Sequence, residues 1–294
     1  MRDATFELFA SMHDALKARH PCTLCNIFQD SLALRKLLAE KPCLLHKAER
    51  AFFLLIPYHE YYHDCLYLAA DIAALEEGLE GLLTAYCSPL AIRGSVIGKE
   101  RLAEEVALAF QRQGFRLEKK LLRMLLGKAP EKIRKALLVF VEEYRNSVSF
   151  ARPDDAEEVL EILLESFDLV ADNIPELSAI RENIAKQQVA ILRRDDKILS
   201  LNYFDYSNGQ IRSLFDVTRK EYRKEGLFLA IQVFLKNYFT ALNMNVLRFV
   251  GWRDVTAIKL LKHSEESNQH VDGVVIYNML WMPGSRLLYG RGHP

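Results

Sequence analysis

The order of short strand-like and longer helix-like segments in the second half of the chain most constrains its fold. Three strand-like segments follow one another directly, and the tight turn Arg194–Lys197 joins the first two, a pattern that predicts an antiparallel meander. A preceding segment places Val159, Leu160 and Leu163 on one helix face. The expected order is a strand at 148–152, helices at 156–167 and after Pro175, strands at 189–193, 198–204 and 211–217, a helix at 226–242, a strand at 246–250, a helix at 255–263 and a strand at 274–281.

The first half shows a related alternation. The spacing of its apolar residues predicts helices at 5–19, 31–41, 75–86 and 100–112 and strands at 51–57, 64–71, 90–97 and 116–125. Gly127–Pro130 is typical of a domain boundary, and an amphipathic helix at 131–144 would connect two domains. We therefore predict an α/β (α+β) protein with domains at 1–128 and 147–294, joined by 129–146.

Length and charge balance limit the class of protein. A chain of 294 residues is long enough for two domains. Its 39 basic and 39 acidic residues cancel, so no net field would hold it on nucleic acid or on an anionic membrane. No run reaches the roughly 18 apolar residues of a spanning helix, and the N-terminus lacks the apolar core of a signal peptide. We expect a cytoplasmic protein that binds neither nucleic acid nor membrane.

The segment Val217–Phe228 joins the end of a strand to the start of a long apolar helix, and it is basic with a single glycine. The first N–H groups of a helix are unpaired and lie at the positive end of its dipole, so they suit an anion such as a pyrophosphate. Gly226 would let the backbone approach the phosphates without an intervening Cβ, and the basic side chains would add charge. The alternative is an ordinary Lys- and Arg-rich surface loop before a core helix.

This segment and the order of elements resemble the GNAT acyltransferase superfamily over roughly residues 147–281. The family has a loop of the form Arg/Gln-x-x-Gly-x-Gly/Ala after an apolar strand end, and Arg223–Phe228 matches it except at the last position. The resemblance implies a central mixed sheet flanked by helices, with acetyl-CoA or another acyl-CoA as cofactor. The cofactor-binding residues that it implies are Val217, Arg219, Arg223, Lys224, Glu225, Gly226, Leu227, Phe228 and Asp254.

The usual acid of the family is replaced. A later helix of the family carries Asn-x-x-Ala-x-x-x-Tyr, whose tyrosine commonly protonates the departing thiolate, and Leu261 stands at that position here. By topology, Tyr277 and His263 are the nearest groups that could act instead, although a half-buried strand tyrosine and a helix-terminal histidine are ordinary structural residues. For the base that accepts the proton of the amine, the resemblance implies water or a meander carboxylate, Asp216 or Asp205.

The first half also resembles this family, as a degenerate second GNAT-like domain. Residues 75–125 repeat the later order of helix, strand, helix, turn and strand, but Leu68–Leu75 has no glycine to admit a phosphate. A different interpretation is a zinc site, because Cys22-x-x-Cys25 and Cys43-x-x-His46 are spaced like two metal-binding knuckles. An odd number of cysteines, five, favours reduced thiols over a disulfide framework.

The sequence thus predicts an acyl-CoA-dependent N-acyltransferase that transfers an acetyl or other acyl group to an amine. The alternatives are a non-catalytic acyl-CoA-binding or scaffold protein with two GNAT-like domains, and a zinc-containing interaction module. The acceptor is open between a small-molecule amine and a peptide amine. Whether the chain forms a homodimer is open as well.

Overall fold

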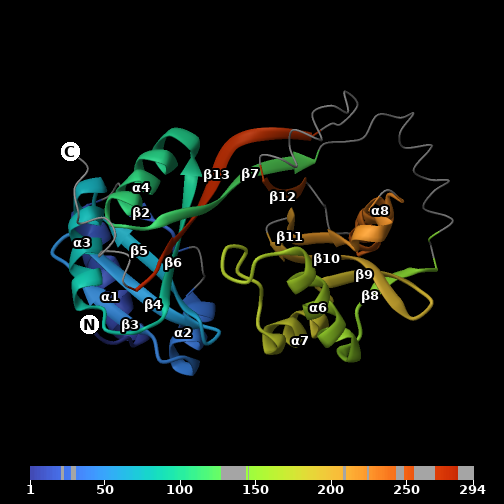
Figure 1. Ribbon diagram of the computed structural model, residues 1–294, viewed down its shortest axis with the longest axis horizontal. Coiled ribbons are helices and arrows are strands. Elements are labelled where there is room, and N and C mark those ends of the chain that lie inside the picture. Colours follow the sequence, from blue (N-terminus) through green and yellow to red (C-terminus); the bar gives the residue numbers. More distant parts are fainter. Residues whose placement is uncertain are drawn as a thin grey trace. The chain divides into compact units, whose positions relative to one another are not determined.

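The chain forms two compact units in the computed structural model (Figure 1). Unit 1 comprises Met1–Lys120 with Val274–Pro294, and unit 2 comprises Leu121–Gly273. The structure describes residues 1–20, 23–27, 31–126, 144, 146–207, 210–223, 225–242, 248–254 and 269–283. No helix in these ranges is long and apolar enough to cross a membrane. The predicted helix at 255–263, and all of 131–144 but its last residue, lie outside the described residues.

Unit 1 is built on a sheet whose strands follow the order β1-β3-β4-β5-β6-β13. Phe52 and Leu54 pack with helices α1 and α2 in one buried cluster, whereas the ring of Phe53 lies against Gly78 of α3. Because successive strand side chains point to opposite faces, helices cover both faces of β4. The elements are β1 (Arg2–Asp3), α1 (Phe6–Arg19), β2 (Leu24–Cys25), α2 (Ser31–Glu40), β3 (Leu44–Lys47), β4 (Ala51–Tyr58), β5 (Tyr62–Ala69), α3 (Ile72–Ala85), β6 (Ala91–Lys99), α4 (Glu100–Arg112) and part of β13 (Gln269–Trp281).

Unit 2 has the strand order β7-β12-β11-β10-β9-β8. Leu201 and Phe215 face α6 and α7 in one buried cluster, and Phe204 and Ile211 face α8 in another. Burying one such side chain stabilises the fold by roughly 1.5–3 kcal/mol, so these clusters hold the helices on the meander. The elements are β7 (Arg116–Leu126), β8 (Val148–Phe150), η1 (Pro153–Asp155), α6 (Ala156–Ser166), α7 (Leu177–Ala185), β9 (Val189–Arg194), β10 (Lys197–Ser207), β11 (Gln210–Thr218), η2 (Lys220–Tyr222), α8 (Leu227–Ala241) and β12 (Arg248–Asp254).

Each unit contains a strand that comes from the other half of the chain. In unit 1, β13 pairs antiparallel with β6, from Val274 opposite Lys99 to Trp281 opposite Ile92. In unit 2, the 121–126 part of β7 pairs antiparallel with β12. This division differs from the predicted boundaries at 128 and 147, because a strand belongs to the unit that holds its hydrogen-bond partners. Local sequence patterns do not predict which distant strand a given strand will pair with.

Buried polar groups fix the position of β13 in unit 1. Asn278 Oδ1 accepts hydrogen bonds from Ser95 Oγ at 3.2 Å and from the Arg93 guanidinium at 3.4 Å. Arg93 is itself buried and pairs with Asp64 at 2.8 Å. A shift of β13 by one residue would move Asn278 to the other face and leave these groups unpaired, at a cost of about 1–3 kcal/mol each.

One parallel strand pair opens in each unit, and we call each opening a fork. In the unit 1 fork, the described pairing of β5 with β6 ends at Cys65 opposite Gly94, and β5 continues to Ala69. In the unit 2 fork, the described pairing of β11 with β12 ends at Ser213 opposite Gly251, and β11 continues to Thr218. A helix follows the continuing strand in both units, α3 in unit 1 and α8 in unit 2.

The structure confirms most of the predicted elements. The meander forms as β9, β10 and β11 with antiparallel pairing, and the long helix after Gly226 is α8. Boundaries move by a few residues, as for α3, which begins at Ile72 because the Asp71 side chain caps it. The last predicted strand is longer than expected and begins at Gln269.

Candidate functional site

The start of α8 is the element that the sequence predicts to bind phosphate. Its N-cap is Gly226, with φ 71° and ψ 14°, and as a glycine this residue has no side chain to cap the helix. This left-handed conformation suits glycine, because a Cβ would be strained there. Leu227 anchors the helix by burying its side chain between α8 and the sheet. The first N–H groups of a helix lie at the positive end of its dipole and can donate to an anion.

Arg219 has a different role from the one predicted. The side chain is buried, and its guanidinium donates to both carboxylate oxygens of Glu165 at 2.9 Å and to the Ile198 carbonyl at 2.9 Å. Glu158 lies 3.5 Å away on the same helix, α6. A guanidinium held by two carboxylates cannot also face a phosphate. The structure therefore corrects the prediction for Arg219, which ties the end of β11 to α6.

Arg223 is the described basic side chain best placed for an anion. It is exposed, and its Nε donates to the Thr218 carbonyl at 3.2 Å, which holds the side chain beside the end of β11. Lys224 lies outside the described residues. Glu225 contributes less than predicted, because its N–H donates to the Tyr222 carbonyl at 3.0 Å and its carboxylate pairs with Arg194 at 3.1 Å.

Two other predicted cofactor residues lie at the end of β11 and in the first turn of α8. Val217 is buried in the α6–α7 cluster, and its carbonyl accepts from Ser200 Oγ at 3.0 Å. Phe228 is half-buried in the first turn of α8. Asp254 ends β12 opposite Leu121 of β7, and its side chain is outside the described part of the structure.

A buried polar cluster lies where the unit 2 fork begins. Asn202 is 3% exposed, and its Nδ2 donates to Ser213 Oγ at 2.7 Å and to the Asp216 carboxylate. Within the described residues, the Asn202 Oδ1 has no hydrogen-bond partner. Asp216 is half-buried on β11, three residues beyond the last parallel pair. The cluster positions the Asp216 carboxylate at the fork. Asn202 was not among the residues predicted from the sequence, because its contact with β11 depends on strand register.

The other predicted catalytic residues do not join Asp216 in unit 2. Tyr277 belongs to unit 1, where it is 5% exposed and pairs with Val96 of β6. The Lys120 ammonium lies 5.3 Å from the centre of its ring. His263 lies outside the described residues. Asp205 forms an exposed ion pair with Arg212 at 2.5 Å, the ordinary surface role that we gave as its alternative.

The residues of the predicted zinc site have other contacts where they are described. Cys43 is buried in the core cluster of α1 and α2, and burial raises the pKa of its thiol to about 11. The Cys25 thiol lies 3.2 Å from the Ile27 N–H, and burial raises its pKa as well. Cys22 is outside the described residues. Among those that are described, no three metal-binding side chains gather.

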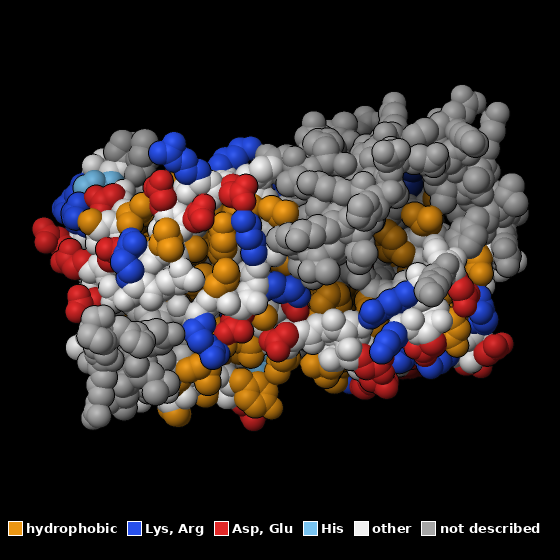
Figure 2. Space-filling model, turned by 45° about the horizontal axis from the view of Figure 1, so that its top comes forward, with side chains coloured by type: hydrophobic (Ala, Val, Ile, Leu, Met, Phe, Trp, Pro, Cys, Tyr) orange, Lys and Arg blue, Asp and Glu red, His pale blue; other side chains and the backbone are white. Residues whose placement is uncertain are grey.

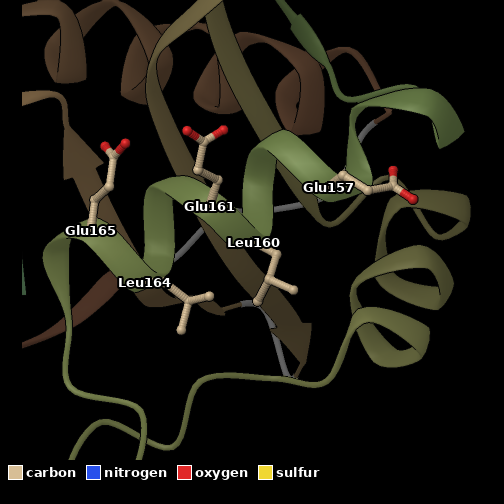
Figure 3. A pocket seen from close by; sticks show the side chains of 5 residues that line it. All are labelled: Glu157, Leu160, Glu161, Leu164 and Glu165. Carbon is tan, nitrogen blue, oxygen red and sulfur yellow. The ribbon is translucent and has the colours of Figure 1, made fainter.

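A shallow depression on α6 is lined by Glu157, Glu161, Glu165, Leu160 and Leu164 (Figure 3). The glutamates project from one side of the helix and the leucines from the other. Two of the carboxylates are in ion pairs, Glu157 with Arg181 and Glu165 with Arg219, so their role is structural. On the described part of the face in Figure 2, acidic and basic side chains are interspersed, in keeping with the balanced charge.

Comparison with known proteins gives the class of fold. No protein-family model and no curated protein matches the chain. A solved GCN5-related N-acetyltransferase from Sphaerobacter thermophilus is similar over 96% of this chain and 94% of its own, with a TM-score of 0.52 and 10% identity. A tandem GNAT protein of the clavulanic acid biosynthesis pathway is similar over 86% of this chain and 88% of its own, with a TM-score of 0.54 and 8% identity.

A third similar structure is a GCN5-related glucosamine N-acetyltransferase region of a fungal multi-domain β-N-acetylglucosaminidase, with a TM-score of 0.53 and 11% identity. It matches 79% of this chain and 31% of that protein. Identities this low bear on the fold alone. The chain has the GNAT fold, a mixed sheet flanked by helices, as the sequence predicted.

Proposed function

We propose that unit 2 binds an acyl-CoA and transfers its acyl group to an amine. The observation that carries the proposal is the left-handed Gly226 at the start of α8, directly beyond the strand that continues past the unit 2 fork. A helix that starts on a glycine, next to a strand that continues past its parallel partner, suits a ligand with a pyrophosphate at one end and an extended amide chain at the other. The GNAT fold of the similar proteins supports the same ligand.

The residues of this site fit the cofactor at its phosphate end. The backbone of Gly226 and Leu227 would approach the pyrophosphate, and Arg223 would add positive charge, with Lys224 beside it in sequence. Arg219 has no part in this binding. When bound, the acyl-CoA supplies an acyl group activated as a thioester, and the products are an amide and free coenzyme A.

Asp216 is our candidate for the base that accepts a proton from the incoming ammonium or amine. A carboxylate needs only to lie within hydrogen-bond reach of that proton, and Asn202 holds this one at the fork. Asn202 is a positioning residue, because it acts through Asp216. Orientation of the amine against the thioester would supply most of the rate, since direct transfer needs no nucleophilic side chain.

A second candidate function is acyl-CoA binding without turnover. Phe228 and Leu261 stand where the family has a small residue and its tyrosine, and Tyr277 belongs to unit 1. Titration calorimetry with acetyl-CoA and CoA tests both functions, and no binding at millimolar ligand would overturn them together. Release of thiol over a broad panel of small and peptide amines separates them, because only the enzyme releases it.

We further propose that the protein works in the cytoplasm and takes an amine as its only other substrate. Gel filtration at several protein concentrations tests for a homodimer. Metal analysis of the purified chain tests the remaining zinc hypothesis, and less than about a tenth of an equivalent would remove it.

A further inference from the structure

The unit 1 fork is filled by a segment of the chain itself. Beyond Cys65, the free edge of β5 pairs antiparallel with β2, with Leu24 opposite Ala69 and Cys25 opposite Leu68. This is the edge on which β6 pairs earlier in β5, since β4 occupies the other edge along the whole strand. We call Thr23–Ile27 the inserted segment.

Asn26 of the inserted segment bridges both strands of the fork. Its Nδ2 donates to the Cys65 carbonyl of β5 and to the Ser95 carbonyl of β6, each at 3.0 Å. Its Oδ1 accepts from the Tyr67 N–H at 2.7 Å, and its own N–H donates to the Tyr67 carbonyl at 3.3 Å. Asn26 is 5% exposed. Both N–H groups of its side-chain amide donate and its Oδ1 accepts, so the fork provides partners for the amide nitrogen and the amide oxygen.

The helix start of unit 1 is occupied in a similar way. Asp71 caps α3, and its Oδ1 accepts from the Ala74 N–H at 2.8 Å while Oδ2 pairs with Arg50 at 2.8 Å. The bond from the Ala74 N–H is the main reason that the pKa of Asp71 is lowered. The chain's own carboxylate thus holds the position that an anionic ligand would take at α8.

We propose that the inserted segment and Asp71 take the place of the acyl-CoA in unit 1, so that the chain has one acyl-CoA site and not two. The inference rests on the proposed function, because that function identifies the equivalent places in unit 2. A strand edge accepts a peptide or any extended chain with amide groups, and the pantetheine arm of coenzyme A is such a chain. The unit 1 fork is therefore a strand-accepting site with a built-in occupant.

The number of bound ligands is the first test. Titration of the full chain with acetyl-CoA should saturate at one equivalent, and Gly226→Asp should weaken that binding about 10- to 100-fold. Two equivalents, with the second retained in Gly226→Asp, would overturn this inference and leave the proposed function intact. No binding at all would overturn the proposed function, and the second test then decides this inference separately.

The second test asks whether unit 1 accepts an amide chain once its occupant is loosened. In Asn26→Ala, exchange of the Tyr67 amide hydrogen should become about tenfold faster, because its acceptor is lost. Millimolar pantetheine, which has no pyrophosphate to meet Asp71, should slow that exchange again. The wild-type chain should show no effect of pantetheine at Tyr67.

The control variant is Asn278→Ala, which truncates an equally buried asparagine of unit 1 that contacts the Ser95 side chain but does not bind Tyr67. It should leave the Tyr67 exchange insensitive to pantetheine. If Asn26→Ala unfolds unit 1, the milder Asn26→Ser serves in its place, with the same expected recovery. The inference would be overturned if pantetheine did not slow exchange of the Tyr67 amide hydrogen in a folded Asn26→Ala or Asn26→Ser chain.

Discussion

Helices α3 and α8 follow equivalent strands in unit 1 and unit 2, yet they begin on residues of opposite character. Asp71 starts α3 with a carboxylate bound to the Ala74 N–H, and Gly226 starts α8 with no side chain at all. The forks differ as well, because in unit 1 the chain's own Asn26 hydrogen-bonds to both strands of the fork. Two copies of one fold can thus be distinguished by what their own chain does at the places where a ligand would bind.

The largest effects should come from the buried arginine of each unit. Arg219→Ala removes the cation that pairs with Glu165 and one of the two that pair with Glu158, and Arg93→Ala removes the cation that pairs with Asp64. Each change should cost about 3 kcal/mol of unfolding free energy, because it leaves a partly buried carboxylate unpaired. Chemical denaturation monitored by hydrogen exchange would locate each loss in its own unit.

Arg212→Ala is the matched control, since it breaks a surface pair with Asp205 and should cost no more than about 1 kcal/mol. A milder change, Arg219→Lys, separates structure from binding. If a folded Arg219→Lys chain lost acetyl-CoA affinity without losing stability, the structural role that we assign to Arg219 would be wrong.

Gly226→Asp should place a carboxylate at the helix start of unit 2, as Asp71 does in unit 1. The new side chain would be strained in the left-handed conformation of this residue, and its carboxylate would repel the phosphates. We therefore expect acetyl-CoA affinity to fall about 10- to 100-fold. Calorimetry measures the change. Gly273→Asp is the control, because Gly273 also has a positive φ, 74°, with open space around it. Equal loss of affinity in both variants would contradict the assignment of the site.

The two forks also differ in their polar side chains. In unit 2, Asn202 binds the Asp216 carboxylate at the fork, and in unit 1 Asn26 of the inserted segment binds both strands. Asp216→Asn should lower kcat about 100-fold if Asp216 is the base, and Asn202→Ala should lower it about tenfold, at the weak end of the range for a lost positioning contact. The KM for acetyl-CoA should not change in either variant. A raised KM with unchanged kcat would assign these residues to binding instead.

The smallest expected effect is at the unit 1 cap. Asp71→Ala should cost about 1 kcal/mol of stability at neutral pH. The pKa of Asp71 is lower in the folded chain than its ordinary value. Its contribution is therefore present above about pH 4 and is lost as the pH falls through the lowered pKa. Denaturation at pH 7 and at pH 3 should show the difference between wild type and variant shrinking, and an unchanged difference would count against the cap.

Much of the fold was predictable because it rests on local patterns. Short apolar runs joined by a tight turn indicated β9 and β10, and helical spacing of apolar residues indicated α1 and α4. The start of α8 at Gly226 was also predictable from local sequence. A glycine after a strand and before an apolar helix has few other roles.

The remainder depends on partners that are distant in sequence. Nothing in the run of basic residues distinguishes Arg219, which α6 holds with two carboxylates, from the exposed Arg223. In the sequence, Asn26 resembles an ordinary loop residue, because its hydrogen-bond acceptors, the carbonyls of Cys65 and Ser95, are distant along the chain. The pairing of Tyr277 with Val96 of β6, about 180 residues earlier, could not be predicted from the residues around it.

That pairing sets the order in which the protein can finish folding during its synthesis. The last strand of the unit 1 sheet starts to pair at Val274 opposite Lys99, so 175 further residues must be made after Lys99 before β6 is covered. At ribosomal rates of roughly 5–20 residues per second, this takes about 10–35 s. Through that time, β6 presents an unpaired edge, which is a hazard for association with other chains. The unit that begins first is therefore completed last.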